Sequence, residues 1–302
     1  MISKFTLKSS YDDLDLSLIE VMPSGHVQAI LQISHGLCGS KERFLPFMEF
    51  MASNGVACVA NDHRGHGKSI KSSEDLGYMY DGGADALLDD MRTVYEWIVK
   101  KYTDVPAFIL GHSMGSLAVR AFIRKYPVVY NGVLICGSPV YNPMASLGYE
   151  VSSLLCRLGL ERLRPVVMHN LMNEFYNRKF ASEGRQAWIC SDSSVRNAFQ
   201  ESPEHNFILT LNGSKTLLDL MVRTYSHSAE LASRHDSPVI FLAGEDDPCT
   251  GGSYGLHKAV SAMRESGYGN ITLKVYPAMR HEVLNEIGKE CVWQDILNFI
   301  GI

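Results

Sequence analysis

Two pentapeptides of the chain match the pattern G-x-S-x-G, at residues 111–115 (GHSMG) and 251–255 (GGSYG). In this pattern a strained turn between a strand and a helix exposes a serine hydroxyl, and the glycines keep other side chains away from it. Ser113 has the required context, because an apolar run at residues 107–110 precedes it and a helical pattern follows it. Ser253 follows a proline-containing loop instead. We therefore predict that Ser113 is a catalytic nucleophile.

A serine hydroxyl becomes a good nucleophile only when a base takes its proton and an acid orients that base. The apolar run at residues 271–276 leads into a loop that carries His281, the predicted base. The preceding run, residues 239–243, ends in three consecutive acidic side chains, any of which could face the base: Glu245, Asp246 and Asp247. Base and acid are thus expected at neighbouring strand ends, the edge where open α/β sheets place their sites.

Backbone N–H groups near the serine are also required, because they stabilise the oxygen of the tetrahedral intermediate. The apolar run at residues 29–33 ends in His35-Gly36-Leu37, where the glycine lets the loop approach the substrate. The Leu37 amide is one predicted donor, and the Met114 amide, next to the nucleophile at a helix start, is the other. The histidine and glycine could instead have a purely structural role.

A polar block at residues 61–69 (NDHRGHGKS) contains His63 and His66, which could resemble metal ligands. No cysteine or carboxylate set at ligand spacing accompanies them, so we interpret the block as a glycine-punctuated, hydrogen-bonded loop. The block also lacks the pattern of a phosphate-binding loop. We predict neither a metal nor a cofactor.

Short apolar runs alternate with longer amphipathic stretches over most of the chain, which is typical of a mostly parallel sheet with crossover helices. Two alternating segments near the N-terminus, residues 5–8 and 14–18, predict half-buried antiparallel strands. The predicted buried strands are residues 29–33, 56–60, 107–110, 133–136, 239–243 and 271–276. The predicted helices are residues 43–54, 84–102, 114–126, 254–266 and 289–300.

Residues 140–232 interrupt this alternation, since they contain no clear strand and indicate several helices. We interpret them as an insertion between two parts of one core, residues 1–139 and 233–302. Within the insertion, residues 151–180 carry apolar side chains at three- and four-residue steps, which predicts a helical layer packed on the core. Some of these side chains could instead line a hydrophobic substrate pocket. Apolar patches on the insertion could also contact a membrane or a second copy of the chain.

Composition excludes several classes of protein. The 302 residues include 28 basic and 33 acidic side chains, a net charge of −5, so nucleic acid is not an expected partner. No apolar run is long enough for a membrane span. Seven scattered cysteines without a C-x-x-C pair favour reduced thiols, and the first dozen residues leave no room for a secretory signal. We expect a cytoplasmic protein.

Taken together, these motifs resemble the α/β-hydrolase superfamily and, within it, the serine aminopeptidase S33 group (Hydrolase_4), which includes monoacylglycerol lipases and bacterial lysophospholipase-like esterases. The landmarks span nearly the whole chain: His35-Gly36, residues 62–69, 111–115 and 244–248, and His281-Glu282. The resemblance implies an α/β fold with a mostly parallel eight-stranded sheet, flanking helices, and a helical cap inserted after the sixth strand. Ser116 departs from the pattern, since many relatives have glycine or alanine there.

The resemblance also assigns roles to residues already singled out: Ser113 as nucleophile, His281 as base, and the amides of Leu37 and Met114 as the oxyanion hole. The family's G-x-x-D acid falls on Asp247, three residues after Gly244. The expected activity is cofactor-independent hydrolysis of carboxylic esters with a medium or long acyl chain, such as a monoacylglycerol or a lysophospholipid.

Three alternatives share these motifs. An S33-type aminopeptidase would need an acidic group for the substrate's free amine, and Glu174, Glu183 or Glu204 could serve. A ligand-binding protein that has lost its chemistry would keep the fold but not the reactive serine. An acyltransferase or cofactor-free perhydrolase would use the same triad with an acceptor other than water.

Overall fold

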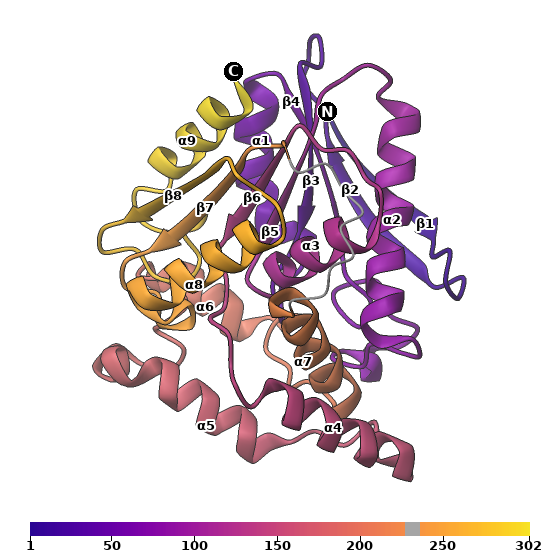
Figure 1. Cartoon of the computed structure of the whole chain (residues 1–302), viewed down its shortest axis with the longest axis vertical. Coiled ribbons are helices and arrows are strands. Elements are labelled where there is room, and N and C mark those ends of the chain that lie inside the picture. The colour runs from indigo at the N-terminus through magenta and orange to yellow at the C-terminus, as the bar shows by residue number, and fades with distance from the viewer. Residues whose placement is uncertain (227–235) are drawn as a thin grey trace.

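The computed structural model describes residues 1–226 and 236–302. In these residues eight strands form one sheet in the order β1-β2-β4-β3-β5-β6-β7-β8 (Figure 1). The strands are β1 (Ile2–Lys8), β2 (Asp15–Val21), β3 (Ala29–Ser34), β4 (Val56–Asn61), β5 (Ala107–His112), β6 (Gly132–Cys136), β7 (Val239–Gly244) and β8 (Ile271–Tyr276). The β1–β2 and β2–β4 pairs are antiparallel and the other pairs are parallel, which confirms the predicted mostly parallel sheet.

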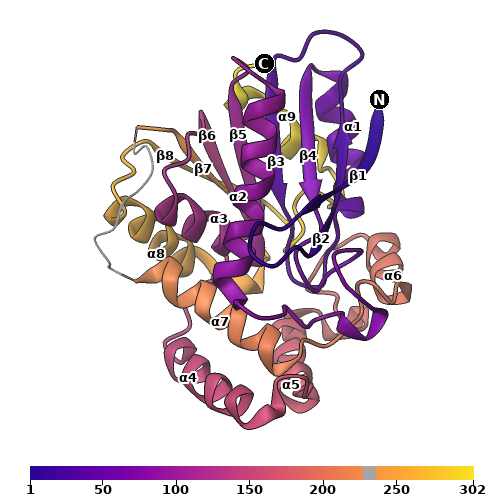
Figure 2. The ribbon, with the colours of Figure 1, turned by 90° about the vertical axis from the view of Figure 1, so that its right-hand side faces the viewer.

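Helices cover both faces of this sheet (Figure 2). One face packs against α1 (Leu45–Ser53) and α9 (Glu290–Ile300). The other face packs against α2 (Gly83–Lys101), α3 (Met114–Lys125) and α8 (Gly252–Glu265). Every residue of β3, β4, β5, β6 and β7 is buried, as expected for strands covered on both faces. The prediction of a buried strand at residues 271–276 is wrong, because β8 is the edge strand of the sheet and only Tyr276 in it is buried.

Between β6 and β7, in the stretch where we predict the insertion, the described residues form four α-helices and two shorter helical segments at residues 156–160 and 178–183. The α-helices are α4 (Ala145–Leu155), α5 (Val166–Asn177), α6 (Ser193–Glu201) and α7 (Leu211–Tyr225). Figure 1 shows α4 and α5 at the end of the molecule farthest from the two termini. The predicted end of the insertion, at residue 232, lies outside the described residues, and the division into 1–139, 140–232 and 233–302 stays a prediction.

The expectation that the apolar residues of segment 151–180 pack as core is wrong for most of them. The exposed fractions are 57% for Leu154, 67% for Leu158, 53% for Leu163, 74% for Val167, 56% for Leu171 and 57% for Phe175. Helical periodicity shows that a helix has an apolar face, but it does not show what covers that face. Among the described residues, no helix combines the length and apolarity needed to cross a bilayer.

Candidate active site

Ser113 lies in the turn between β5 and α3, at the carboxyl edge of the sheet. Its backbone has φ 53° and ψ −119°, a strained conformation for a residue with a side chain. Glycines make the turn possible: a Cβ on Gly115 would lie 2.1 Å from the carbonyl oxygen of Ser34, and one on Gly36 would lie 3.0 Å from Cβ of Ser113. The Ser113 N–H donates to the Cys136 carbonyl (2.9 Å), which ties the turn to β6.

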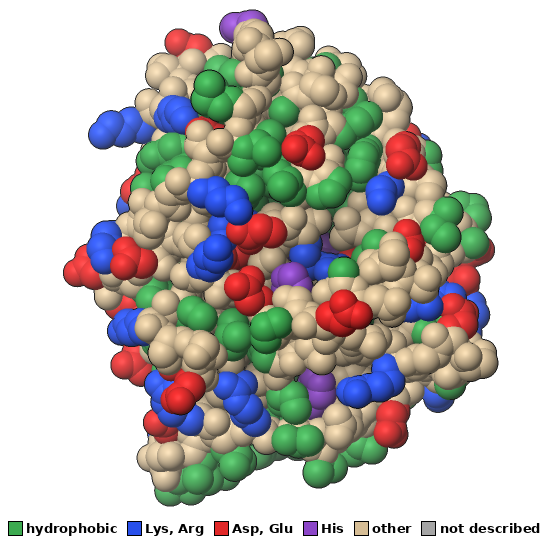
Figure 3. Space-filling model, turned by 180° about the vertical axis from the view of Figure 1, so that it is seen from behind, with side chains coloured by type: hydrophobic (Ala, Val, Ile, Leu, Met, Phe, Trp, Pro, Cys, Tyr) green, Lys and Arg blue, Asp and Glu red, His purple; other side chains and the backbone are tan. Residues whose placement is uncertain are grey.

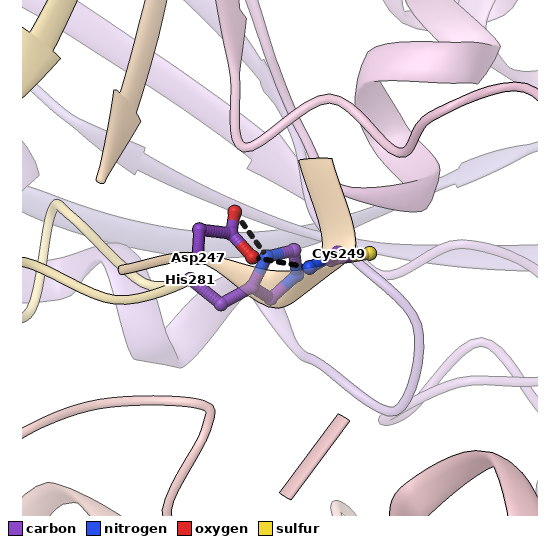
Figure 4. Close-up of side chains that lie close together, drawn as sticks. All are labelled: Asp247, Cys249 and His281. Carbon is purple, nitrogen blue, oxygen red and sulfur yellow. Dashed lines mark hydrogen bonds and ion pairs between the residues drawn. The ribbon is translucent and has the colours of Figure 1, made fainter. Parts of the chain in front are cut away.

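His281 lies between Ser113 and Asp247 in one chain of hydrogen bonds. The Ser113 hydroxyl donates to His281 Nε2 (2.8 Å), and His281 Nδ1–H donates to Asp247 Oδ2 (2.9 Å). The other oxygen of Asp247 accepts the backbone N–H of Cys249 (2.8 Å), so this carboxylate is held on both sides (Figure 4). His281 is 4% exposed and Asp247 2% exposed, and the structure thus brings together three residues from three different strand ends.

The three consecutive acids after β7 have different surroundings. Glu245 is exposed, and Asp246 forms an ion pair with Lys179. Only Asp247 turns inward to the imidazole of His281. Among these three acids, Asp247 is the one that contacts His281, and its role as the catalytic acid stays a prediction.

The pKa of His281 results from two opposing effects. Burial lowers it, but the charge of Asp247, the hydrogen bond to it and the charge of Glu282 together raise it more, so that the net pKa lies above the ordinary value of 6.5. The neutral imidazole, with Nδ1 protonated toward Asp247, leaves Nε2 free to take the Ser113 proton. The arrangement can therefore perform nucleophilic catalysis with general-base assistance.

The two predicted oxyanion donors border the cavity beside the serine. Leu37 and Met114 both line it, and within residues 1–226 and 236–302 neither amide donates to a protein acceptor. His35 fixes the loop that carries Leu37: its Nδ1–H donates to the Gly36 carbonyl (2.7 Å), and its Nε2 accepts the His63 N–H (2.8 Å). This geometry leaves both amides available to an oxygen bound at the serine, and their role stays a prediction.

The polar block at residues 61–69 forms a buried, hydrogen-bonded loop behind His35, in agreement with our interpretation of it. Asp62 accepts the backbone N–H groups of Lys41 (2.9 Å) and Lys68 (2.8 Å). Burial lowers the pKa of His63 to about 3 and that of His66 to about 4, so both rings are neutral at physiological pH.

One group of side chains in the described part of the chain has the geometry of a possible metal site, and it is not the one around His63. The ligand atoms of Asp247, Cys249 and His281 all lie within 4.8 Å of one another (Figure 4). Two of them already hydrogen-bond to each other, and burial raises the pKa of the Cys249 thiol, which keeps it protonated. We interpret this group as the acid and base of the site with a neutral cysteine beside them.

A cavity of about 830 Å³ opens onto Ser113. This volume lies in the range of about 300–1,000 Å³ typical of small-molecule sites. Its wall is mainly apolar, and α5 and α7 contribute several of the side chains: Met172, Phe175, Leu217, Leu218 and Met221. The ion pair between Arg43 and Glu282 is a polar exception in this wall.

Trp188 is a cavity residue that our sequence analysis does not identify. Its ring centroid lies 5.1 Å from that of His281 and 4.9 Å from that of Tyr176. No motif marks these aromatic residues, because they lie in the segment between β6 and β7, where the family resemblance offers no landmark. The only signal in the sequence is that three aromatic residues lie close together, at positions 175, 176 and 188, which could have suggested a pocket wall.

The acids considered for recognition of a free amine lie elsewhere. Glu174, Glu183 and Glu204 are not among the residues that line this cavity. Glu183 instead accepts a hydrogen bond from Arg280 (2.7 Å). The geometry therefore offers no support for the aminopeptidase alternative from these three residues.

Comparison with known proteins is consistent with the family resemblance seen in the sequence. Residues 25–288 match the family described as serine aminopeptidase, S33 (Hydrolase_4). The chain is 24% identical over 285 residues to a monoacylglycerol lipase of Mycolicibacterium smegmatis, covering 92% of this chain and 90% of the relative.

Solved structures show the same fold. A thermostable carboxyl esterase from Bacillus coagulans superposes with a TM-score of 0.88 at 24% identity, covering 99% of this chain and 98% of the esterase. A soluble variant of monoglyceride lipase from Saccharomyces cerevisiae superposes with a TM-score of 0.76 at 18% identity, covering 98% and 94% of the two chains.

Proposed function

This chain belongs to the serine aminopeptidase S33 family of α/β-hydrolases, and we propose that it cleaves carboxylic esters with Ser113 as the nucleophile. The observation that carries the proposal is the hydrogen-bond chain from Ser113 through His281 to Asp247 at an apolar cavity. Relatives named monoacylglycerol lipase support ester hydrolysis over the other reactions of the fold.

The proposed mechanism uses only side chains and backbone groups. Ser113 Oγ attacks the ester carbonyl while His281 Nε2 takes its proton, and Asp247 stabilises the imidazolium that forms. The amides of Leu37 and Met114 donate to the oxyanion. His281 then protonates the leaving alcohol, and water, activated by the same imidazole, releases the acyl group from the serine.

We propose an acyl group of medium or long chain, as in a monoacylglycerol or a lysophospholipid. The apolar cavity supports this choice, because each methylene group of an alkyl chain that leaves water makes the free energy of binding more favourable by about 0.8 kcal/mol. The aromatic and aliphatic walls from α5 and α7 offer such a surface next to the serine.

A panel of p-nitrophenyl esters from two to sixteen carbons tests this function, with Ser113→Ala as the baseline. An optimum at eight carbons or more that disappears in the variant supports the proposal. Aminoacyl amides belong in the same panel, and Ser113-dependent cleavage of the amides alone would favour the aminopeptidase. Absence of any Ser113-dependent turnover, with no covalent labelling by a fluorophosphonate, would contradict hydrolysis altogether.

We further propose that the exposed apolar face of α4 and α5 contacts the surface of a lipid aggregate. Figure 3 shows hydrophobic side chains along the lower edge of the molecule, where these helices lie. Phe175 is 57% exposed and also lines the cavity, so the exposed face continues into the pocket. A monoacyl lipid could therefore pass from an aggregate to the cavity over an apolar path.

The double variant Val167→Ser, Leu171→Ser tests this contact, because both side chains lie on the face and outside the cavity wall. Binding to phosphatidylcholine vesicles should weaken by about tenfold, while turnover of a dissolved short-chain ester stays within about twofold. Val129→Ser, at a 51% exposed position far from this face in the sequence, is the matched control. A dimer in analytical ultracentrifugation that the double variant dissociates would assign the face to self-association instead.

A further inference from the structure

Glu286 is a buried carboxylate that the proposed mechanism does not use. It lies five residues after His281, between β8 and α9, and is 1% exposed. Oε1 accepts the backbone N–H groups of Arg280 (2.9 Å) and Ser191 (2.8 Å). Oε2 accepts the Ser191 hydroxyl and the Ile287 N–H (3.3 Å). Such a complete set of donors compensates for the cost of burying the charge.

These donors belong to two segments about 90 residues apart in the sequence. Arg280 directly precedes the proposed base, and Ser191 lies in the segment that follows Trp188 in the cavity wall. Glu286 therefore joins the loop of His281 to the wall of the pocket through a single side chain.

Further contacts join the same two segments on both sides of His281. The Glu282 N–H donates to the Ile189 carbonyl (2.9 Å). The Arg280 guanidinium donates to the Ala187 carbonyl (2.6 Å) and stacks over the Phe180 ring at 3.9 Å. The residues before and after the base are thus both held by residues 180–191.

The influence of Glu286 on His281 is one of position and not of charge. The charged groups that raise the pKa of His281 are Asp247 and Glu282, and Glu286 is not one of them. The Glu286 oxygens face backbone N–H groups and a serine hydroxyl, whose positions determine the path of the loop.

We propose that Glu286 is a positioning residue that holds the His281 loop against residues 187–191, so that the imidazole stays in line between Ser113 and Asp247. The proposal rests on the ester hydrolase function proposed above. It also implies that residues 180–191 are a fixed part of the active site. In the described part of the chain, α4 and α5 have no comparable hydrogen bonds to the His281 loop.

Glu286→Gln tests the proposal with almost no change in volume. The amide has one acceptor oxygen, so its NH₂ group must face at least one of the backbone N–H donors. We expect kcat for the preferred p-nitrophenyl ester to fall by about 30-fold with KM within about twofold, because a small misplacement of a catalytic group is costly. Glu290→Gln, an exposed carboxylate at the start of α9, is the control and should leave kcat unchanged within about twofold.

A titration of His281 by NMR of ¹⁵N-labelled histidine supplies a readout that does not need turnover. In Glu286→Gln the pKa of His281 should fall, because looser contact with Asp247 leaves burial as the stronger effect. A folded variant with unchanged kcat and an unchanged His281 pKa would overturn the proposal. If the wild-type protein shows no Ser113-dependent turnover, the ester proposal fails, and the titration still tests the role of Glu286.

Ser191→Ala keeps the test decisive if Glu286→Gln does not fold. This variant removes the hydroxyl bond to Glu286 and leaves the backbone N–H bond in place. We expect a loss of about threefold to tenfold in kcat and a smaller downward change in the His281 pKa. If Ser191→Ala matches the wild type in both measurements, the positioning role is wrong.

Discussion

The chain contains the same five-residue pattern twice, and the two copies have different surroundings. Ser113 is buried, has φ 53°, and donates to an imidazole held by a carboxylate. Ser253 is exposed on the first turn of α8. It also has a histidine within reach, since its Oγ lies 3.3 Å from Nδ1 of His257, four residues later.

The second serine nevertheless lacks a usable base. His257 Nδ1–H donates to the Ser253 carbonyl (2.7 Å), so the nitrogen near the hydroxyl already carries a proton. In the described part of the chain, no carboxylate hydrogen-bonds to His257. A neighbouring histidine is therefore not enough to activate a serine, and an acid that orients the histidine is also required.

The last glycine of each copy does not distinguish the two sites. A Cβ on Gly115 would lie 2.1 Å from the Ser34 carbonyl oxygen, and a Cβ on Gly255 would lie 2.0 Å from that of Thr250. Both positions thus need glycine because a backbone segment packs directly against them. The pattern thus indicates close backbone packing at both sites, whereas only Ser113 has the hydrogen-bonded histidine and carboxylate that the proposed chemistry needs.

The largest contrast should appear when each serine is replaced by alanine. Ser113→Ala should lower kcat/KM for the preferred ester by at least about 10⁴-fold, because members of a triad act as a unit. Ser253→Ala should leave kcat/KM within about twofold, and steady-state kinetics on both variants checks the pair. A comparable loss in the two variants would contradict the assignment of the nucleophile to Ser113 and not to Ser253.

A smaller effect, equal at both sites, is expected when the last glycine of each copy is replaced. Gly115→Ala and Gly255→Ala should each lower the free energy of unfolding by about 2–3 kcal/mol, because the added methyl group meets backbone that must shift. Urea unfolding measures this change. Gly269→Ala is the control, since a Cβ there meets nothing within 4 Å, and it should change stability by less than about 0.5 kcal/mol.

The pH profile gives the smallest effect and concerns the base that only the first serine has. His281 must be neutral to accept a proton, and its pKa lies above 6.5. The kcat/KM should therefore fall about tenfold per pH unit below that pKa. In Asp247→Asn the carboxylate that raises the pKa of His281 is absent. The acid limb of the remaining activity should therefore shift to lower pH. An acid limb that does not move would contradict the role of Asp247.

The fold was predictable where a local pattern has one structural solution. Continuous apolar runs such as residues 239–243 predict strands buried on both faces, and the structure confirms them as part of a parallel sheet. The strand ends then indicate where Ser113 and His281 lie, because the carboxyl ends of parallel strands meet at one edge.

The helical segment between β6 and β7 was less predictable. An amphipathic pattern predicts a helix with an apolar face, but not what packs against that face. Leu154 and Val167 repeat at helical spacing like core residues, yet they are 57% and 74% exposed. Trp188 lines the cavity beside His281 without any motif to indicate it.

The amino-acid sequence by itself predicted a nucleophile, a base and the order of elements around them, because glycine spacing and hydrophobic periodicity act over a few residues. The family resemblance already pointed to Asp247 among three adjacent acids, but only the tertiary structure shows its contact with His281, and only it brings Glu286 to Ser191. The physical reason is that these contacts join residues 34 and 95 positions apart, and strand order and loop packing, not local spacing, bring such residues together.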